Sequence, residues 1–253
     1  MPNEFVNLHS KNVRIWFLLA FQAGSINAGG FMACHRFVTH TTGFATHFAY
    51  ELATHHEGAA LGMLSVPFFF LIGSLISSYF VDLPLSLGKN PNHMLPCALI
   101  VFCLASALFL GATGYFGDFS NDMKIREDYG LLALLCLASG LQNAMLTNAK
   151  GMVVRTTHLT GVTTDLAVGI VRSFFGSSPE NPRQIAAERL ATLSRAGIIA
   201  SFVAGSTVSA YLFVMTRYLG FAVPLFTSFI LFFHFFVRAK KRRDRCKALS
   251  SQS

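Results

Sequence analysis

Six stretches of this chain are apolar and almost free of charge. Five of them contain no Asp, Glu, Lys or Arg, and the first contains one arginine near its start. They are residues 13–32, 59–81, 94–116, 129–146, 196–215 and 219–237. Since a helix of about 20 apolar residues crosses a bilayer, the chain is predicted to be an all-α integral membrane protein with six transmembrane helices.

The overall composition agrees with this prediction. Charged residues make up 13% of the chain and apolar residues 53%, whereas soluble domains carry about 25% charged residues. Six spans leave little chain for a soluble domain, so residues 1–253 are expected to form a single membrane domain. The first apolar stretch follows Lys11 and Arg14 and also fits a cleaved signal peptide. The internal copy of its motif, described next, argues against removal.

Three motifs occur twice, in the same order. Gly24-Ser25-Ile26-Asn27-Ala28 is echoed by Gly140-Leu141-Gln142-Asn143-Ala144, and Thr39-His40-Thr41-Thr42-Gly43 by Thr157-His158-Leu159-Thr160-Gly161. Gly73-Ser74-Leu75-Ile76-Ser77 returns as Gly205-Ser206-Thr207-Val208-Ser209. Such recurrence indicates an internal duplication, with repeats at about 12–116 and 129–237. Each repeat holds three spans, an odd number, so the two repeats are expected to have inverted topology, as in many secondary transporters.

Basic residues are concentrated in alternate loops. The expected cytoplasmic side collects Lys89, Lys150, Arg183, Arg195 and the basic tail at 238–253, and the other side carries only Arg36, Lys124, Arg126 and Arg217. By the positive-inside rule, both termini are expected to be cytoplasmic. The tail is predicted to attract anionic lipid headgroups. Nucleic-acid binding is not expected, because no groove-reading or aromatic pattern accompanies the basic residues.

A short amphipathic segment follows the first span of each repeat. Each begins at a Thr-Gly pair, Thr42-Gly43 and Thr160-Gly161, and is too short to span a membrane. A re-entrant half-helix is the favoured interpretation, and an interfacial helix is the alternative. Threonine caps helix starts, and a helix start carries a partial positive charge. Two inverted half-helices would therefore direct two positive ends at one site near the membrane midplane.

Several polar residues are candidates for that site. The substrate-binding candidates are Asn27, Asn143, Gln142, His40, His158, Thr42, Gly43, Thr160 and Gly161. The alternative for the amides and threonines is hydrogen bonding between helices, and for the histidines it is the capping of helix ends. Asp165, on the polar face of the second half-helix, is a candidate for ion or proton coupling, with a structural ion pair as the alternative. The motifs at Gly73 and Gly205 are assigned to helix packing.

Other chemistry is less well supported. His47, Glu51 and His55 share one helical face and form a candidate metal site, but the second repeat lacks these residues, and metal binding is the less favoured interpretation. The five cysteines include no CxxC pair and are predicted to be buried apolar residues. No HExxH, GxSxG or Walker motif is present, so neither an enzyme nor a bound cofactor is expected.

The motifs Gly24–Phe31, His40–Gly43, Gln142–Ala144 and Arg155–Gly161 resemble those of the YoaK family, and the likeness covers nearly the whole chain. That family comprises small multi-pass proteins of the bacterial inner membrane, and the resemblance implies this location. From the residues, the predicted function is a small secondary transporter or channel for a small polar or anionic solute, with a homodimer as one possible assembly. The alternatives are a non-transporting scaffold or sensor, and a metal-ion transporter.

Overall fold

The computed structural model describes residues 10–39, 42–119, 128–145, 159–175 and 182–250. In this part of the chain all regular structure is helical, as the sequence predicted. The long helices are α1 (Ser10–Cys34), α4 (Ser65–Phe80), α6 (Met94–Ala112), α7 (Asp128–Met145), α9 (Pro182–Thr216) and α10 (Ala222–Ser250). The remaining helices are α2 (Thr42–Ala53), α3 (Glu57–Met63), α5 (Asp82–Ser86), α8 (Leu159–Phe175) and the 3-10 helix η1 (Arg217–Phe221).

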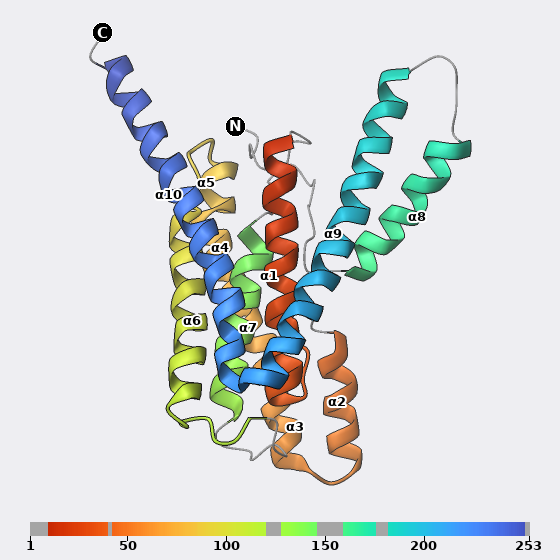
Figure 1. Cartoon of the computed structure of the whole chain (residues 1–253), viewed down its shortest axis with the longest axis vertical. Coiled ribbons are helices and arrows are strands. Elements are labelled where there is room, and N and C mark those ends of the chain that lie inside the picture. The colour runs from red at the N-terminus through yellow and green to blue at the C-terminus, as the bar shows by residue number, and fades with distance from the viewer. Residues whose placement is uncertain (1–9, 40–41, 120–127, 146–158, 176–181, 251–253) are drawn as a thin grey trace.

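The long helices stand side by side in a bundle and alternate in direction along the chain (Figure 1). Helices α1, α6 and α9 run down the view, whereas α4, α7 and α10 run up it. The start of α1 and the end of α10 therefore lie at the same end of the bundle. Helices α1 and α7, which carry the two copies of the first duplicated motif, run in opposite directions.

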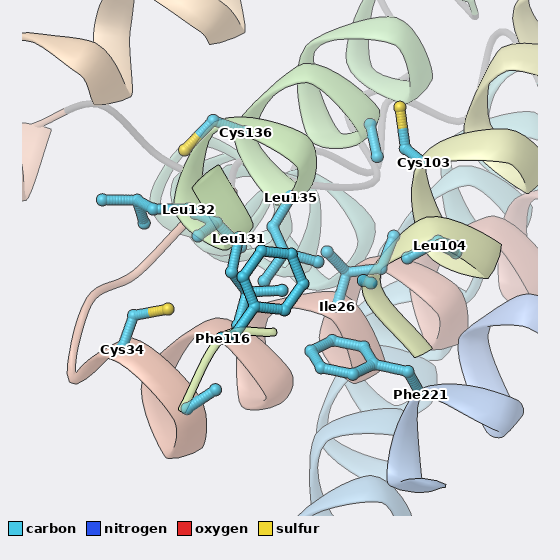
Figure 2. Packing of buried hydrophobic residues seen from close by; sticks show 14 of the residues in the cluster. Ile26, Cys34, Cys103, Leu104, Phe116, Leu131, Leu132, Leu135, Cys136 and Phe221 are labelled. Atoms are coloured by element: carbon cyan, nitrogen blue, oxygen red, sulfur yellow. The ribbon is translucent and has the colours of Figure 1, made fainter. Parts of the chain in front are cut away.

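The interior is packed with apolar side chains from helices distant in sequence. Ile26 of α1, Leu135 of α7 and Phe221 of η1 are fully buried in one cluster, and Figure 2 shows them gathered near Phe116. A second cluster surrounds Trp16 in the first half of α1. The described cysteines Cys34, Cys97, Cys103 and Cys136 are buried and form no disulfide bond with one another.

The outer surface of the bundle is also apolar. Phe102 and Phe109 on α6, Leu75 on α4 and Phe233 on α10 are each more than half exposed. A helix that is apolar on both its inner and outer faces suits a lipid environment rather than water. The described residues contain four stretches long and apolar enough to cross a membrane, which are Asn12–Cys34, Ala60–Ser86, Met94–Ala112 and Ile185–Asp244.

The number of candidate spans is four, whereas the sequence has six apolar blocks, for two reasons. The last stretch runs through α9, η1 and α10 and contains two of the blocks, although the chain reverses direction at η1. The apolar part of α7, Tyr129–Met145, is shorter than the others. These apolar helices are compatible with a multi-pass membrane protein, as the sequence predicted.

The duplicated glycine motifs make the same contacts twice. A methyl group added at Gly24 would overlap the backbone oxygen of Phe202 in α9, and one added at Gly140 would overlap that of Phe70 in α4. The Ser206 hydroxyl donates a hydrogen bond to the Gly24 oxygen (3.1 Å), and the equivalent Ser74 hydroxyl donates to the Gly140 oxygen (3.2 Å). Two helix pairs, α1 with α9 and α7 with α4, thus use the same close approach.

The partner helix of each pair also places a glycine against the backbone of the other helix. Gly205 of α9 leaves no room for a methyl group against the Phe21 oxygen of α1, and Gly73 of α4 leaves none against the Leu137 oxygen of α7. The packing role predicted for Gly73 and Gly205 is confirmed. Each pair joins a helix that carries the first duplicated motif to a helix that carries the Gly-Ser motif, and the two helices of a pair come from opposite halves of the chain.

Candidate functional site

The two short helices with Thr-Gly starts lie on one flank of the bundle. Helix α2 begins at Thr42, as the sequence predicted, and α8 contains Thr160 and Gly161 in its first turn. In Figure 1 both helices begin near mid-height on the same side of the bundle and run towards opposite ends. Helix α8 packs against α9, whereas no residue of α2 is buried.

The Thr-Gly starts are accessible at the surface of the chain. Thr42 and Thr160 are exposed, and Gly43 and Gly161 are partly exposed. Among the described residues beyond its own helix turn, no atom lies within 4 Å of a methyl group placed at Gly43. Asp165 on α8 is exposed too. These residues therefore border open space on the flank and are not enclosed within the chain.

Asn27 holds the segment that precedes α2. Its side-chain oxygen accepts hydrogen bonds from the Val38 amide (3.3 Å), the Thr39 amide (3.4 Å) and the Thr39 hydroxyl (2.9 Å). Asn27 and Thr39 are both buried. The Asn27 oxygen is thus occupied by the chain itself, and it fixes where the backbone turns after α1. Asn27, from the first duplicated motif, thus bonds to Thr39, the first residue of the second motif.

The second repeat is described less completely at this point. Asn143 on α7 is half-buried. His40 and His158, both predicted to contact substrate, lie outside the described residues. The segment between α7 and α8 lies outside them as well, so an equivalent turn held by Asn143 is not described.

Two glutamine side chains are buried inside the bundle, and each joins α1 to another helix. Gln142 of α7 donates a hydrogen bond from its Nε2 atom to the backbone oxygen of Leu19 in α1 (2.7 Å). Gln22 of α1 donates from its Nε2 atom to the Ser228 hydroxyl of α10 (2.6 Å). Each glutamine is 1% exposed, and neither Oε1 atom has a hydrogen-bond partner among the described residues. Gln22 was not among the predicted site residues, although a lone amide within an apolar block was a signal for it.

The candidate metal face is arranged as an ion-pair cluster. The Glu51 carboxylate contacts the Arg36 guanidinium (3.3 Å) and Nδ1 of His56 (3.3 Å), while His55 ends the turn with a positive φ of 62°. Burial, and secondly the charge of Arg36, lower the pKa of His47, and the charge of Glu51 opposes this shift. Among the described residues no group of three His, Cys, Asp or Glu side chains could hold a metal ion.

An open apolar groove lies on the first half of α9. It is lined by Ile185, Ala186, Arg189, Leu190 and Leu193. Leu190 and Leu193 are exposed, which agrees with the lipid-facing or interfacial stripe that this stretch shows in sequence. The groove includes none of the residues predicted for the solute site.

Comparison with known proteins gives a family but no described activity. The family described as "Protein of unknown function (DUF1275)" matches residues 15–237 of the chain. No curated protein and no solved structure matches the chain.

Proposed function

This chain belongs to the DUF1275 family, and from its own residues we propose that it is a small secondary transporter or channel. The solute is a small polar or anionic molecule, bound where the two repeats meet near the middle of the membrane. The proposal takes the chain as six spans in two inverted three-helix repeats. It is not proposed to be an enzyme, and its partners are the lipid bilayer and the solute.

The observation that carries this proposal is the repeated contact between helix pairs. The bond from Ser206 to Gly24 in the α1–α9 pair recurs as the bond from Ser74 to Gly140 in the α7–α4 pair. A duplication that preserves such contacts, with counterpart helices α1 and α7 running in opposite directions (Figure 1), supports the inverted arrangement. In folds of that kind the site lies at the repeat interface.

The starts of α2 and α8 support the choice of solute. The unpaired N–H groups of a helix start favour a negative or hydrogen-bond-accepting group. The proposed contacts are Thr42 and Gly43 on α2, Thr160 and Gly161 on α8, the adjacent His40 and His158, and the amides Asn27, Gln142 and Asn143. Asp165 is proposed to couple transport to an ion or a proton. Because the Asn27 oxygen holds the turn before α2, Asn27 contributes mainly by positioning that helix start.

The exposed flank supports a homodimer. Thr42, Thr160 and Asp165 are accessible on the single chain, and polar groups at membrane depth are costly when they face lipid. A second copy covering this flank would enclose the site. The proposed location is the bacterial inner membrane, with both termini cytoplasmic, as the resemblance to the YoaK family and the basic tail imply.

The second candidate is a scaffold or sensor that transports nothing. The densely filled interior around Ile26, Leu135 and Phe221 favours it (Figure 2), because a packed bundle needs no permeation path. The metal-transporter alternative receives less support, since Arg36 and His56 already engage Glu51.

Two measurements test the proposal. Purified protein is reconstituted in liposomes and uptake is compared across panels of anionic and neutral solutes, with Asn143→Ala as the variant. Saturable uptake that Asn143→Ala reduces is expected, and absence of uptake across the panels favours the scaffold. Reporter fusions at Ser120 and Ser178 test the topology independently: the inverted arrangement requires opposite sides of the membrane, and finding both on one side contradicts it.

A further inference from the structure

The bundle contains two rigid helix pairs, each drawn from both repeats. Helices α1 and α9 are joined by the backbone contacts at Gly24 and Gly205, and α4 and α7 by those at Gly73 and Gly140. These are the two most extensive helix contacts in the described chain, whereas α1 meets α7 over a smaller area. The place where the two pairs meet, between α1 and α7, is called the seam below.

Gln142 contributes its amide to the seam, and Gln22 lies on the neighbouring turn of α1 with its NH₂ group directed at α10. Gln22 is the middle residue of the 25-residue helix α1, so it lies at the depth expected of the membrane midplane. Gln142 reaches from α7 to the Leu19 oxygen, one helical turn before Gln22. Gln142 therefore contacts α1 within one turn of Gln22.

Local chemistry determines how each amide is oriented. The Leu19 backbone oxygen can only accept, so Gln142 must present its NH₂ group to it. The Ser228 hydroxyl donates to the Pro224 oxygen (2.7 Å), so it accepts from the NH₂ group of Gln22. As long as the Ser228 hydroxyl donates to the Pro224 oxygen, neither amide can be turned over without placing two acceptors against each other. Both Oε1 atoms therefore remain directed into the protein as acceptors.

These two oxygens lack donors in a water-excluded position. Both are buried and have no hydrogen-bond partner among the described residues. Leaving such a group unsatisfied costs about 1–3 kcal/mol, so a donor-bearing ligand that fills the position is favoured. An anion supplies no donor. A cation would lack a counter-charge, since α1 contains no acidic residue and α7 only Asp128 at its first position.

We propose that the seam binds a small neutral solute whose N–H or O–H groups donate to Gln22 Oε1 and Gln142 Oε1. The inference rests on the proposed transport function and narrows it to uncharged hydrogen-bond donors such as polyols or amides. It also adds Gln22 to the proposed solute contacts.

Binding is measured on the purified full-length chain in detergent. Trp16 is the single tryptophan; it is buried in α1 one turn before Leu19, so its fluorescence reports on the seam. The neutral probes are glycerol, erythritol and acetamide, and the anionic probes are acetate and inorganic phosphate. A saturable change in Trp16 fluorescence and in melting temperature is expected with a neutral probe.

Three variants locate the binding. Gln22→Met and Gln142→Met keep the side-chain volume but remove the oxygen, and each is expected to weaken binding roughly tenfold. Ser139→Ala is the matched control. Ser139 is equally buried on α7, but its hydroxyl is satisfied by the Leu135 oxygen of its own helix (2.8 Å). It is expected to leave binding unchanged.

The outcomes separate this inference from the proposed function. Saturable binding or uptake of an anion with no response to any neutral probe overturns the seam assignment but leaves transport standing. A neutral response that survives both Gln→Met variants also overturns it, because the two oxygens then hold only buried water. Absence of a response to every neutral probe overturns the assignment as well, and if uptake is absent across both panels the transport proposal fails with it.

Discussion

Gly24→Ala tests the most consequential packing feature of the fold. The added methyl group would lie closer than 3.0 Å to the Phe202 backbone oxygen, a separation that real Cβ atoms do not show. Because the obstacle is backbone, no rotamer change relieves the overlap, and α1 and α9 must move apart. The Ser206 hydrogen bond to the Gly24 oxygen (3.1 Å) would lengthen with that movement.

The expected loss of stability can be estimated from these terms. Overpacking a tight interior costs about 1–3 kcal/mol or more, and an interhelical hydrogen bond in a membrane protein is worth about 0.6 kcal/mol. Alanine improves helix propensity by about 1 kcal/mol over glycine. The net effect is a loss of about 2 kcal/mol in the free energy of unfolding. The matched control is Gly58→Ala in α3, where no atom lies within 4 Å, and it should be neutral or slightly stabilising.

The assay is unfolding in mixed micelles, followed by the fluorescence of the single tryptophan. Gly140→Ala meets the equivalent obstacle, the Phe70 oxygen, and should cost about as much as Gly24→Ala. The two losses should add, because the pairs share no contact at these sites. If Gly24→Ala proves as stable as Gly58→Ala, the close approach of the helix pairs is not what holds the bundle together.

Three further predictions follow from particular side chains. Asn27→Ala removes the acceptor of three hydrogen bonds from Val38 and Thr39, so it should lower the free energy of unfolding by about 2 kcal/mol and speed amide exchange at those two residues. Asn27→Asp keeps the oxygen and should lower the free energy of unfolding less. Equal stability of Asn27→Ala and wild type would contradict this role. Gly43→Ala meets open space, so it should leave stability unchanged while reducing solute uptake, and full uptake would remove Gly43 from the proposed site. Burial, and secondly the charges of Arg242 and Arg238, lower the pKa of His93 to about 3. Folded His93 therefore stays neutral at pH 5, whereas His93 in the unfolded chain gains a proton below its ordinary pKa of 6.5, so the free energy of unfolding should fall by about 2 kcal/mol by pH 5. A pH profile of stability that His93→Gln does not flatten would refute this.

Much of the fold follows from local patterns in the sequence. The charge-free blocks predicted the helices of the bundle, because apolar residues at that length leave the backbone no partner other than itself in lipid. The sequence also predicted a helix start at Thr42, where α2 begins. The recurring Gly-Ser motifs at Gly73 and Gly205 correctly indicated close helix packing, since only residues without bulk allow backbones to touch.

Which helices pair, and which polar atoms are left over, depended on the tertiary structure. The sequence assigned Asn27 to the solute, but its oxygen is taken by Val38 and Thr39, which a return of the chain after α1 brings to it. It left out Gln22, because only the packing of α7 and α10 against α1 shows that the Gln22 oxygen has no donor. Periodicity and capping act over a few residues and can be read along the chain. The contacts of a buried amide are decided by residues distant in sequence, 206 positions away for Gln22 and Ser228, and exist only once the helices have packed.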